Sequence, residues 1–322
     1  MQVIHDATRS AYLPYGVVAT IGNYDGVHRG QQAVISKVVE RARARGSSAV
    51  VITFQPHPVS VLRPDAAPQL LTLDRQRETI LESLGVDALL IVRFTKDFAN
   101  TTAEAFVRDF LHRQLALEEL YVGSEFGFGK QRGGDVDLLR RIGDELGFTV
   151  EGIDEELYRG DVISSTRVRS AVRDGQVELA LELLGRPYGL LGTVVRGDRM
   201  GQKLGWPTIN LLPENEILPQ DGVYCGRARF TNLPGVFDCV TNVGTRPTVY
   251  ENYDRVVESH LLGFSADVYG EEVEVCFYKR LREERLFPSV MDLSAQIARD
   301  VEAAREYFTN RRRLEAALPS GV

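Results

Sequence analysis

Two hydrophobic patterns follow one another along this chain. In the first half, short runs of aliphatic and β-branched residues are separated by longer stretches in which apolar residues recur every three to four positions. The short runs predict strands, and the longer pattern predicts amphipathic helices. We expect strands over residues 16–21, 49–54, 88–94 and 120–122, and helices over 32–45, 73–84 and 103–115. This alternation favours a parallel sheet with right-handed crossovers, a Rossmann-like α/β fold.

Local signals mark one helix start and one domain boundary. Thr101, followed three residues later by Glu104, predicts a capping box at the start of the helix over 103–115. A further helical pattern, over 177–184, ends at Gly185-Arg186-Pro187, where Gly and Pro stop a helix. The pattern then changes to β, so we expect domains over 1–186 and 187–322.

The second half is expected to form an antiparallel β-barrel with a terminal helix. Short runs over 223–230, 236–243, 256–262 and 272–278 are bounded by turn residues. Regular short strands of this kind indicate an antiparallel barrel. The helix that follows Asp292 carries an apolar stripe, which we expect to pack against the barrel. The stripe consists of Leu293, Ile297, Val301, Ala304 and Phe308.

A glycine-rich stretch opens the second half. Residues 192–210 read GTVVRGDRMGQKLGWPTIN. Glycine lets a backbone approach a phosphate closely, because no Cβ intervenes. The hydroxyl of Thr208 and the amide oxygen of Asn210 are hard ligands suited to Mg²⁺. The stretch is neither a Walker loop nor a dinucleotide fingerprint. A glycine-rich barrel hairpin is the alternative, but the Pro-Thr-x-Asn end favours a functional loop.

In the first half, polar loops follow three of the expected strands. His28 lies one turn before the helix expected over 32–45, where free N–H groups attract phosphate, and His57 lies between two prolines. The loop after the fourth strand, 123–130, is rich in glycine and contains Glu125. A run of small hydroxyl residues and arginines over 163–169 opens another helix. Taken singly, such residues are as often helix caps, but ligands of parallel sheets bind at this edge.

Composition limits the classes of function. The 322 residues carry a net charge of −7, which argues against a general nucleic-acid binder. The three cysteines, Cys225, Cys239 and Cys276, form no CxxC pair and are expected to be thiols of a reducing compartment. The first residues lack an apolar signal core, and no apolar run reaches membrane-spanning length. We expect a soluble cytoplasmic protein without nucleic-acid or membrane partners; the sequence leaves its oligomeric state open.

Taken in this order and at these separations, the motifs resemble bacterial bifunctional FAD synthetases over nearly the whole chain. The first half resembles their adenylyltransferase half, which belongs to the nucleotidyltransferases that carry an H-x-G-H motif. The matching positions are Gly22, Asp25, Gly26, His28, Gly30, 53–58, Gly123, Phe126, Gly127, Gly129 and 164–169. The spacing V-x-G-x-x-x-G-x-x-x-G-x-P-T-x-N resembles the flavokinase signature. The resemblance implies transfer of the ATP γ-phosphate to riboflavin, giving FMN, and adenylylation of FMN to FAD.

The resemblance also implies roles for individual residues. Glu258 would accept the hydroxyl proton of riboflavin, beside His260 in the family's E-x-H-L context, and His28 would donate to phosphate oxygens in adenylyl transfer. Thr208 and Asn210 would hold Mg²⁺. The ATP contacts of the kinase half would be Gly197, Asp198, Gly201, Lys203, Gly205, Pro207, Thr208 and Asn210. The nucleotide contacts of the other half would be Gly22, Asp25, Gln31, His57, Glu125, Ser164, Ser165, Thr166 and Arg169.

Two further stretches match the family without an implied catalytic role. Residues 242–248, NVGTRPT, resemble its NIGxxPT turn, which is structural or closes over the flavin. Arg282, Glu284 and Phe287 match another stretch of the family.

Two positions depart from the family pattern. Gln31 stands where most relatives have the second histidine of H-x-G-H, and Glu125 where most have Asn. A neutral amide replaces an imidazole, and a carboxylate is added near anionic substrates, so we expect FMN adenylylation to be weakened. One alternative is a kinase whose first domain only binds nucleotide. Another is a non-catalytic flavin-binding regulator, against which the intact Pro-Thr-x-Asn end and Glu258 argue.

Overall fold

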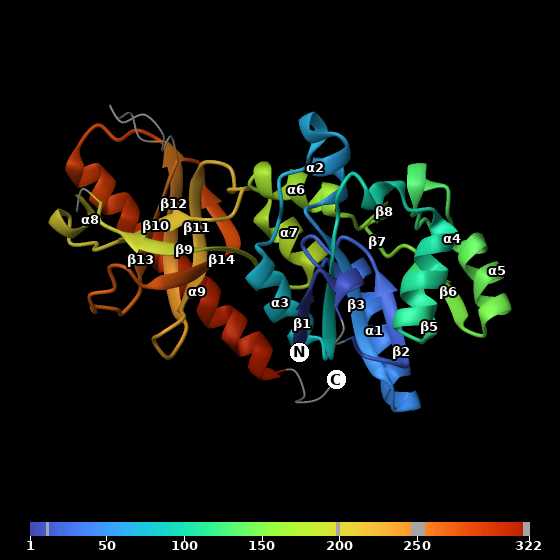
Figure 1. Cartoon of the computed structure of the whole chain (residues 1–322). Helices are drawn as coiled ribbons and strands as arrows, with labels where there is room; N and C mark the ends of the chain where they lie inside the picture. Colours follow the sequence, from blue (N-terminus) through green and yellow to red (C-terminus); the bar gives the residue numbers. More distant parts are fainter. Residues whose placement is uncertain (11–12, 198–199, 246–254, 318–322) are drawn as a thin grey trace. The chain divides into compact units, whose positions relative to one another are not determined.

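A computed structural model describes residues 1–10, 13–197, 200–245 and 255–317 (Figure 1). Contacts along the chain define two compact units, Met1–Ser165 and Thr166–Val322. The helices α6 (Ser165–Arg173) and α7 (Val177–Leu184) lie between this division and the expected boundary after residue 186. That boundary stays a prediction.

The first unit is built on a six-stranded parallel sheet, as the alternating pattern predicts. The strand order is β1-β4-β3-β2-β5-β6, and each neighbouring pair is parallel. The order reverses at β2, between β3 and β5, which is where ligands bind in open α/β sheets. The strands are β1 (Gln2–His5), β2 (Val17–Ile21), β3 (Ser48–Gln55), β4 (Ala88–Arg93), β5 (Leu117–Gly123) and β6 (Thr149–Ile153).

Helices cover both faces of this sheet (Figure 1). Alternate residues of β3 point to opposite faces: Val51 packs with Ile35 and Leu81, whereas Ile52 packs in the cluster that contains Phe110. Burial on both faces explains why the central strands are almost continuously apolar. The helices are α1 (Arg29–Arg45), α2 (Pro58–Leu62), α3 (Asp74–Ser83), α4 (Ala103–Ala105), a π-helical continuation (Phe106–Gln114) and α5 (Val136–Leu146). A short hairpin, β7 (Leu157–Tyr158) with β8 (Asp161–Val162), follows.

The predicted capping box at Thr101 and Glu104 is wrong by one residue. The cap of α4 is Thr102, whose hydroxyl accepts the N–H of Ala105 at 3.1 Å. Thr102 has the extended backbone that an N-cap requires. Thr101 instead lines a pocket.

A buried carboxylate joins α1 to β5. Glu119 is 3% exposed and accepts two bonds from Arg41, at 2.7 and 2.9 Å. It also accepts bonds from Arg45 at 3.1 Å and from the Tyr121 hydroxyl at 2.7 Å. The bond from Arg41 is the main cause that lowers the pKa of Glu119 to about 2, against the effect of burial.

We expect the first unit to lose stability as the pH falls from about 4.5 to about 2. A carboxyl whose pKa is lower in the folded than in the unfolded state stabilises the fold above the unfolded value. It loses that contribution as the pH falls through the folded value. The shift corresponds to on the order of 3 kcal/mol. Glu119→Gln should lower the free energy of unfolding at neutral pH, as measured by denaturant unfolding. The variant's free energy of unfolding should also fall less steeply than the parent's as the pH drops below about 4.5. An equally steep fall in the variant would contradict this assignment.

The second unit contains the expected closed antiparallel barrel, in the order β10-β13-β12-β11-β14-β9. Its strands are β9 (Tyr188–Val195), β10 (Ile209–Pro213), β11 (Gly222–Phe230), β12 (Phe237–Thr245), β13 (Arg255–Leu261) and β14 (Glu272–Arg282). The short helix α8 (Met200–Lys203) lies between β9 and β10.

The terminal helix α9 (Val290–Ala317) packs on the barrel through the predicted stripe. Val301, Ala304 and Phe308 are buried against barrel residues that include Cys225 and Tyr278. Partial burial of Ile297 extends this contact, and Leu293 is half-buried.

The cysteines are free thiols, with Cys225 and Cys239 fully buried. Burial raises the pKa of Cys225 and of Cys239 to about 12, so these thiols are neutral at physiological pH. In the part of the chain that the structure describes, none of the helices is long and apolar enough to span a bilayer. The cytoplasmic location stays a prediction.

Candidate functional site

Two histidines of the first unit cap helices in the same way. His28 is the N-cap of α1, and its Nδ1 accepts the backbone N–H of Gln31 at 3.4 Å. His57 is the N-cap of α2, and its Nδ1 accepts the N–H of Val59 at 3.2 Å. Because Nδ1 is the acceptor in both rings, a neutral ring carries its proton on Nε2. Both side chains therefore cap a helix through Nδ1.

Gln31 completes a reciprocal cap with His28. Its side-chain Oε1 accepts the backbone N–H of His28 at 3.1 Å. Next to it, Arg29 forms an ion pair of 2.5 Å with Glu156. The amide oxygen of Gln31 and the guanidinium of Arg29 are thus both engaged within the protein.

Asp25 holds the loop after β2 in place. Its carboxylate is buried and accepts the N–H groups of Leu71 at 2.8 Å and Thr72 at 3.2 Å. The backbone oxygen of Asp25 accepts the Ser165 hydroxyl at 2.8 Å. The loop passes through two left-handed non-glycine residues, Tyr24 and Val27. These contacts give Asp25 a structural function, and its predicted nucleotide contact stays a prediction.

The remaining predicted residues of the first half differ in exposure. Ser164 is half-buried, as is Ser165 at the start of α6. Gly22 lies against Tyr24, whose ring would come within 3.1 Å of an added Cβ. Thr166 and Arg169 lie on α6 within the second unit, where Arg169 is buried and Thr166 exposed.

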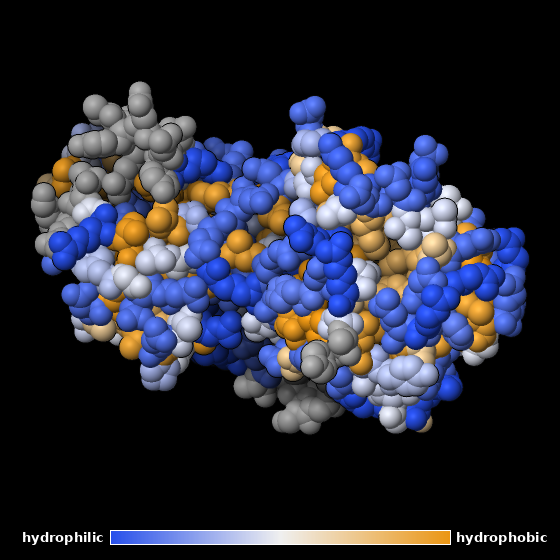
Figure 2. All heavy atoms as spheres, viewed as in Figure 1, coloured by the Kyte–Doolittle hydropathy of each residue, from blue (hydrophilic) through white to orange (hydrophobic). Residues whose placement is uncertain are grey.

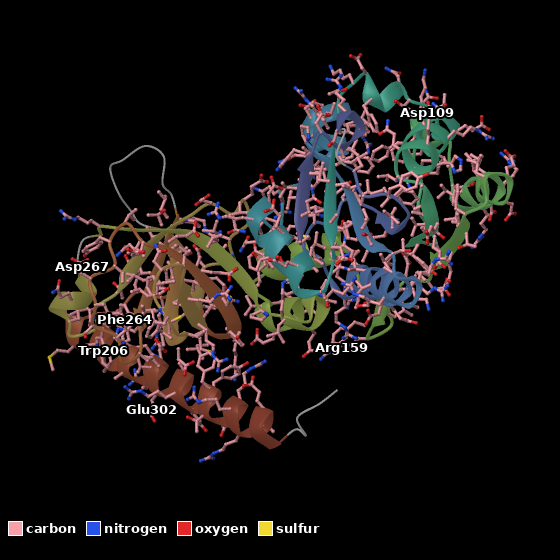
Figure 3. All side chains as sticks on the ribbon, turned by 60° about the horizontal axis from the view of Figure 1, so that its bottom comes forward. Asp109, Arg159, Trp206, Phe264, Asp267 and Glu302 are labelled. Atoms are coloured by element: carbon pink, nitrogen blue, oxygen red, sulfur yellow. The ribbon has the colours of Figure 1, made fainter. Side chains whose placement is uncertain are left out.

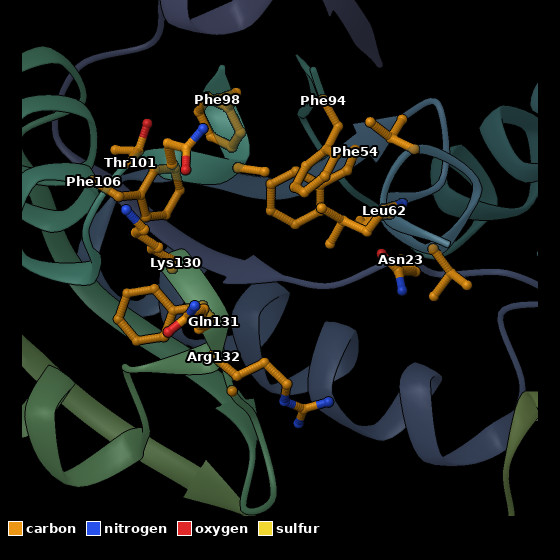
Figure 4. Close-up of a pocket in the computed structure, with 18 of the residues that line it drawn as sticks. Asn23, Phe54, Leu62, Phe94, Phe98, Thr101, Phe106, Lys130, Gln131 and Arg132 are labelled. Atoms are coloured by element: carbon orange, nitrogen blue, oxygen red, sulfur yellow. The ribbon is translucent and has the colours of Figure 1, made fainter. Parts of the chain in front are cut away.

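A pocket of about 800 Å³ opens beside the loop after β2. Figure 4 shows several of the phenylalanines that line it, and in Figure 2 apolar atoms are visible in a hollow between α2 and α4. Neighbouring ring centroids lie 5.6–6.3 Å apart. The rings, in spatial order, are Phe54, Phe94, Phe98, Phe106, Phe128 and Phe126.

The charged side chains on the pocket wall are mostly cationic. Four cations face one carboxylate, Glu125, although the whole chain is acidic. Glu125 is exposed and forms no ion pair with a described residue. The cations are Arg63, Lys96, Lys130 and Arg132. A wall of aromatic rings and positive charge suits a flat aromatic ligand with a phosphate tail.

Sequence reasoning did not find this pocket. Its rings come from the end of β3, from the segment after β4 that contains Phe94 and Phe98, from the start of the π-helix and from the loop after β5. Only Phe54, Phe126 and Phe128 belong to stretches that the motifs single out. The available signal was Phe94, which directly follows β4, much as Phe54 lies one residue before the end of β3.

In the barrel, the predicted base lies between two asparagines. Glu258 on β13 is the direct register partner of Asn210 on β10 and of Asn242 on β12. All three are half-buried, whereas Val257 and Ser259 point into the barrel. Direct partners on adjacent strands point to the same face. The three polar side chains therefore form one row across three strands.

The Pro-Thr-x-Asn turn is fixed next to this row. His260, on the same face as Glu258, bonds through Nδ1 to the oxygen of Pro207 at 2.8 Å, so Nδ1 is the donor. Its ring is nearly perpendicular to that of Trp206, which is labelled in Figure 3, and the two centroids are 5.4 Å apart. Trp206 Nε1 donates to the hydroxyl of Ser294 at 3.2 Å. Thr208, half-buried, directly precedes β10.

Two glycines of the glycine-rich stretch, Gly197 and Gly201, lie too close to their neighbours to carry a side chain. A Cβ on Gly197 would lie 2.4–2.5 Å from the amide group of Asn210. A Cβ on Gly201 would lie 2.4 Å from the oxygen of Trp206 and 3.2 Å from the hydroxyl of Thr208. The loop therefore packs on both proposed metal ligands. Gly205 is left-handed, with φ of 81°.

Some predicted residues are not described. Asp198 and the end of the NVGTRPT turn, 246–248, lie outside the described residues, as does the side chain of Lys203.

Of the other family-matched residues, Arg282 forms a buried ion pair with Asp300 at 2.9 Å, which joins β14 to α9. Glu284 accepts a bond from Asn242 at 3.4 Å, and Phe287 lies under the guanidinium of Arg282. Among the described residues, no group of three or more His, Cys, Asp or Glu could hold a metal ion.

Comparisons with known proteins match both halves of the chain. The family model described as FAD synthetase matches residues 12–167, and the one described as riboflavin kinase matches 184–308. The bifunctional riboflavin kinase/FMN adenylyltransferase of Escherichia coli K12 is 41% identical over 91% of this chain and 93% of its own length. The protein of the same name from Haemophilus influenzae is 34% identical over 96% of this chain and 100% of its own.

One solved structure matches nearly the whole chain. It is described as a macrolide-efflux protein from Streptococcus pneumoniae and has a TM-score of 0.85 at 27% identity. The match covers 95% of this chain and 99% of that one.

Proposed function

The chain belongs to the family of bifunctional riboflavin kinases/FMN adenylyltransferases, and we propose that its barrel and its parallel-sheet unit carry out the two transfers in series. The barrel phosphorylates riboflavin to FMN, and the first unit joins FMN to the AMP part of ATP. The observation that carries the kinase assignment is the row Asn210–Glu258–Asn242 beside the Pro-Thr-x-Asn turn.

Glu258 is proposed to accept the proton of the riboflavin 5′-hydroxyl as its oxygen attacks the γ-phosphorus of ATP. Phosphoryl transfer depends mainly on positioning and charge stabilisation, so the fixed geometry of the row matters. Asn210 and Asn242 hold positions on either side of the carboxylate. His260 fixes the carbonyl of Pro207 and with it the turn that carries Thr208.

Thr208 and Asn210 are proposed to hold Mg²⁺. A hydroxyl and an amide oxygen are hard donors, and Mg²⁺ usually completes its shell with water and substrate phosphates. A site with few protein ligands fits the lack of a larger acidic cluster among the described residues. When bound, the ion supplies positive charge to the transferring phosphoryl group.

Thr208→Ala and Asn210→Ala should each weaken Mg²⁺-dependent use of ATP, because each removes one oxygen ligand. Riboflavin binding should change less, since both variants keep Glu258 itself. Calorimetry with ATP·Mg²⁺, together with FMN formation rates, measures both effects. Unchanged nucleotide affinity and turnover in both variants would exclude the metal assignment.

The aromatic pocket is proposed to hold the isoalloxazine ring of FMN during adenylylation. A phosphate oxygen of FMN attacks the α-phosphorus of ATP, a P–O bond forms and pyrophosphate leaves. Charge develops on the phosphoryl oxygens, and Nε2–H of His28 is a donor suited to them. The pocket is lined by Gly22 and Asn23, from the loop that leads to His28 and α1.

Assaying the two half-reactions separately tests this function. With riboflavin, ATP and Mg²⁺, we expect FMN, and addition of EDTA should abolish its formation. With FMN, ATP and Mg²⁺, we expect FAD and pyrophosphate. FMN without any FAD would support a kinase with an inactive first unit. Neither product would support a flavin-binding regulator and overturn the proposal.

A further inference from the structure

We propose that Arg132 binds the 5′-phosphate of FMN and makes the aromatic pocket select FMN over riboflavin. The inference rests on the proposed function of this pocket as the flavin site. The two flavins share the same ring and differ at the end of the ribityl chain, where one has a hydroxyl and the other a phosphate. Discrimination between them therefore requires a group that recognises the phosphate.

The loop that carries Arg132 is rigidly built. Phe128 and Gly134 exchange two backbone hydrogen bonds, of 2.9 and 3.0 Å, and the N–H of Arg132 donates to the oxygen of Gly129 at 3.0 Å. A Cβ on Gly129 would lie 2.7 Å from the backbone of Ala103. Arg132 itself has a left-handed backbone, with φ of 55°. Such a conformation persists only where the surroundings impose it.

The conformation of this loop places the guanidinium over Gly127. Two guanidinium nitrogens of Arg132 lie 2.9 Å from the point where a Cβ of residue 127 would stand. Figure 4 shows Arg132 on the opposite side of the pocket from Phe94 and Phe98. A flavin whose ring lies on the phenylalanines can thus extend its tail towards the guanidinium.

Arg132 differs in pairing from several other arginines of this unit. Arg41, Arg43, Arg45 and Arg108 each form ion pairs of 2.5–3.1 Å with Asp or Glu. Arg132 makes neither an ion pair nor a side-chain hydrogen bond with any described residue. A guanidinium presents a planar fork that matches two phosphate oxygens, which a lysine cannot do. This fork favours Arg132 over the neighbouring Lys96 and Lys130. Arg63, the other arginine of the wall, is not held in a left-handed backbone, since its φ is −143°.

The test measures flavin selectivity of the full chain during FAD formation from FMN and ATP. The two quantities are the KM for FMN and the inhibition constant of riboflavin competing with FMN. Arg132→Met should raise the KM for FMN by roughly 10–100-fold, because a charge-assisted pair is lost. The riboflavin constant and the KM for ATP should stay at the parent values.

Gly127→Ala is a second variant, which keeps the charge. Its methyl group displaces the flexible end of Arg132, so the fold should persist. We expect the same selective rise in the KM for FMN. Arg113→Met removes an exposed arginine of the same unit that pairs with Asp109 and does not line the pocket, so it is the matched control, with little expected change.

Three results would overturn the inference while leaving FAD formation intact. The first is an equal rise of the KM for FMN and of the riboflavin inhibition constant. The second is a rise confined to the KM for ATP, and the third is an equally large rise of the KM for FMN in Arg113→Met. Absence of FAD in the parent would instead contradict the proposed function itself.

Discussion

Replacing Glu258 by Gln is expected to slow FMN formation by about 10²–10⁴-fold, the usual cost of removing a general base. The amide keeps the size of the side chain and its place between Asn210 and Asn242 but cannot accept a proton. Rates of FMN formation from riboflavin and ATP, with products separated, measure the effect. Because the first unit does not use this residue, FAD formation from supplied FMN should stay unchanged.

Glu272→Gln provides the matched control for that variant. Glu272, the first residue of β14, is also a half-buried strand carboxylate. Unlike Glu258, it lies outside the polar row and accepts the Thr231 hydroxyl at 2.8 Å. We expect the control to phosphorylate riboflavin at the parent rate. FMN formation at the parent rate by a folded Glu258→Gln protein would show that Glu258 is only a solvated strand carboxylate.

The second large effect is expected at the two departures from the family pattern. We predict that FMN adenylylation is slower than riboflavin phosphorylation and that Gln31→His with Glu125→Asn accelerates it. Losing one good donor to a developing oxyanion costs about 10²–10³ in rate. The oxygen of Gln31 is engaged by His28, and Arg29 is paired with Glu156, so Arg29 does not simply replace the missing positive charge.

The effect of Glu125 is smaller than its charge alone suggests. A carboxylate about 4 Å from an anionic substrate, at an effective dielectric near 20, costs on the order of 4 kcal/mol at most. Lys130 and Arg132 line the same pocket and oppose this repulsion. We therefore expect Gln31→His to account for most of the gain.

Measuring FAD formation from FMN and ATP in the parent, both single variants and the double variant tests this prediction. Phosphorylation of riboflavin by the barrel should be the same in all four proteins. If the parent forms FAD as fast as it forms FMN, and the double variant gains nothing, the two departures are neutral. Recruitment of Mg²⁺ by Glu125, which would reverse its own penalty, is the alternative that such a result supports.

Much of the architecture follows from local patterns. The central strands β2 to β5 are buried on both faces, so their apolar runs stand out. The edge strands β1 and β6 are short and partly exposed, and the pattern did not reveal them. The strand β10 was not predicted, because its residues were assigned to a functional motif.

The site was predictable in parts. Glu258 and His260 are two residues apart on β13, so strand alternation alone places them on one face. The partners of Glu258 depend on pairing between distant strands, and a single sequence does not give that register. The pocket had the same difficulty, since its rings meet only after four separate segments fold together.

A time course of the parent protein with riboflavin, ATP and Mg²⁺, with FMN and FAD separated at each point, tests the central claim most directly. If both transfers occur on one chain in series, FMN appears first, without a lag, and accumulates while FAD rises later. Because adenylylation is predicted to be the slower step, FMN should remain in excess of FAD for most of the reaction. Failure to form FMN, or FAD appearing without FMN preceding it, would contradict the account.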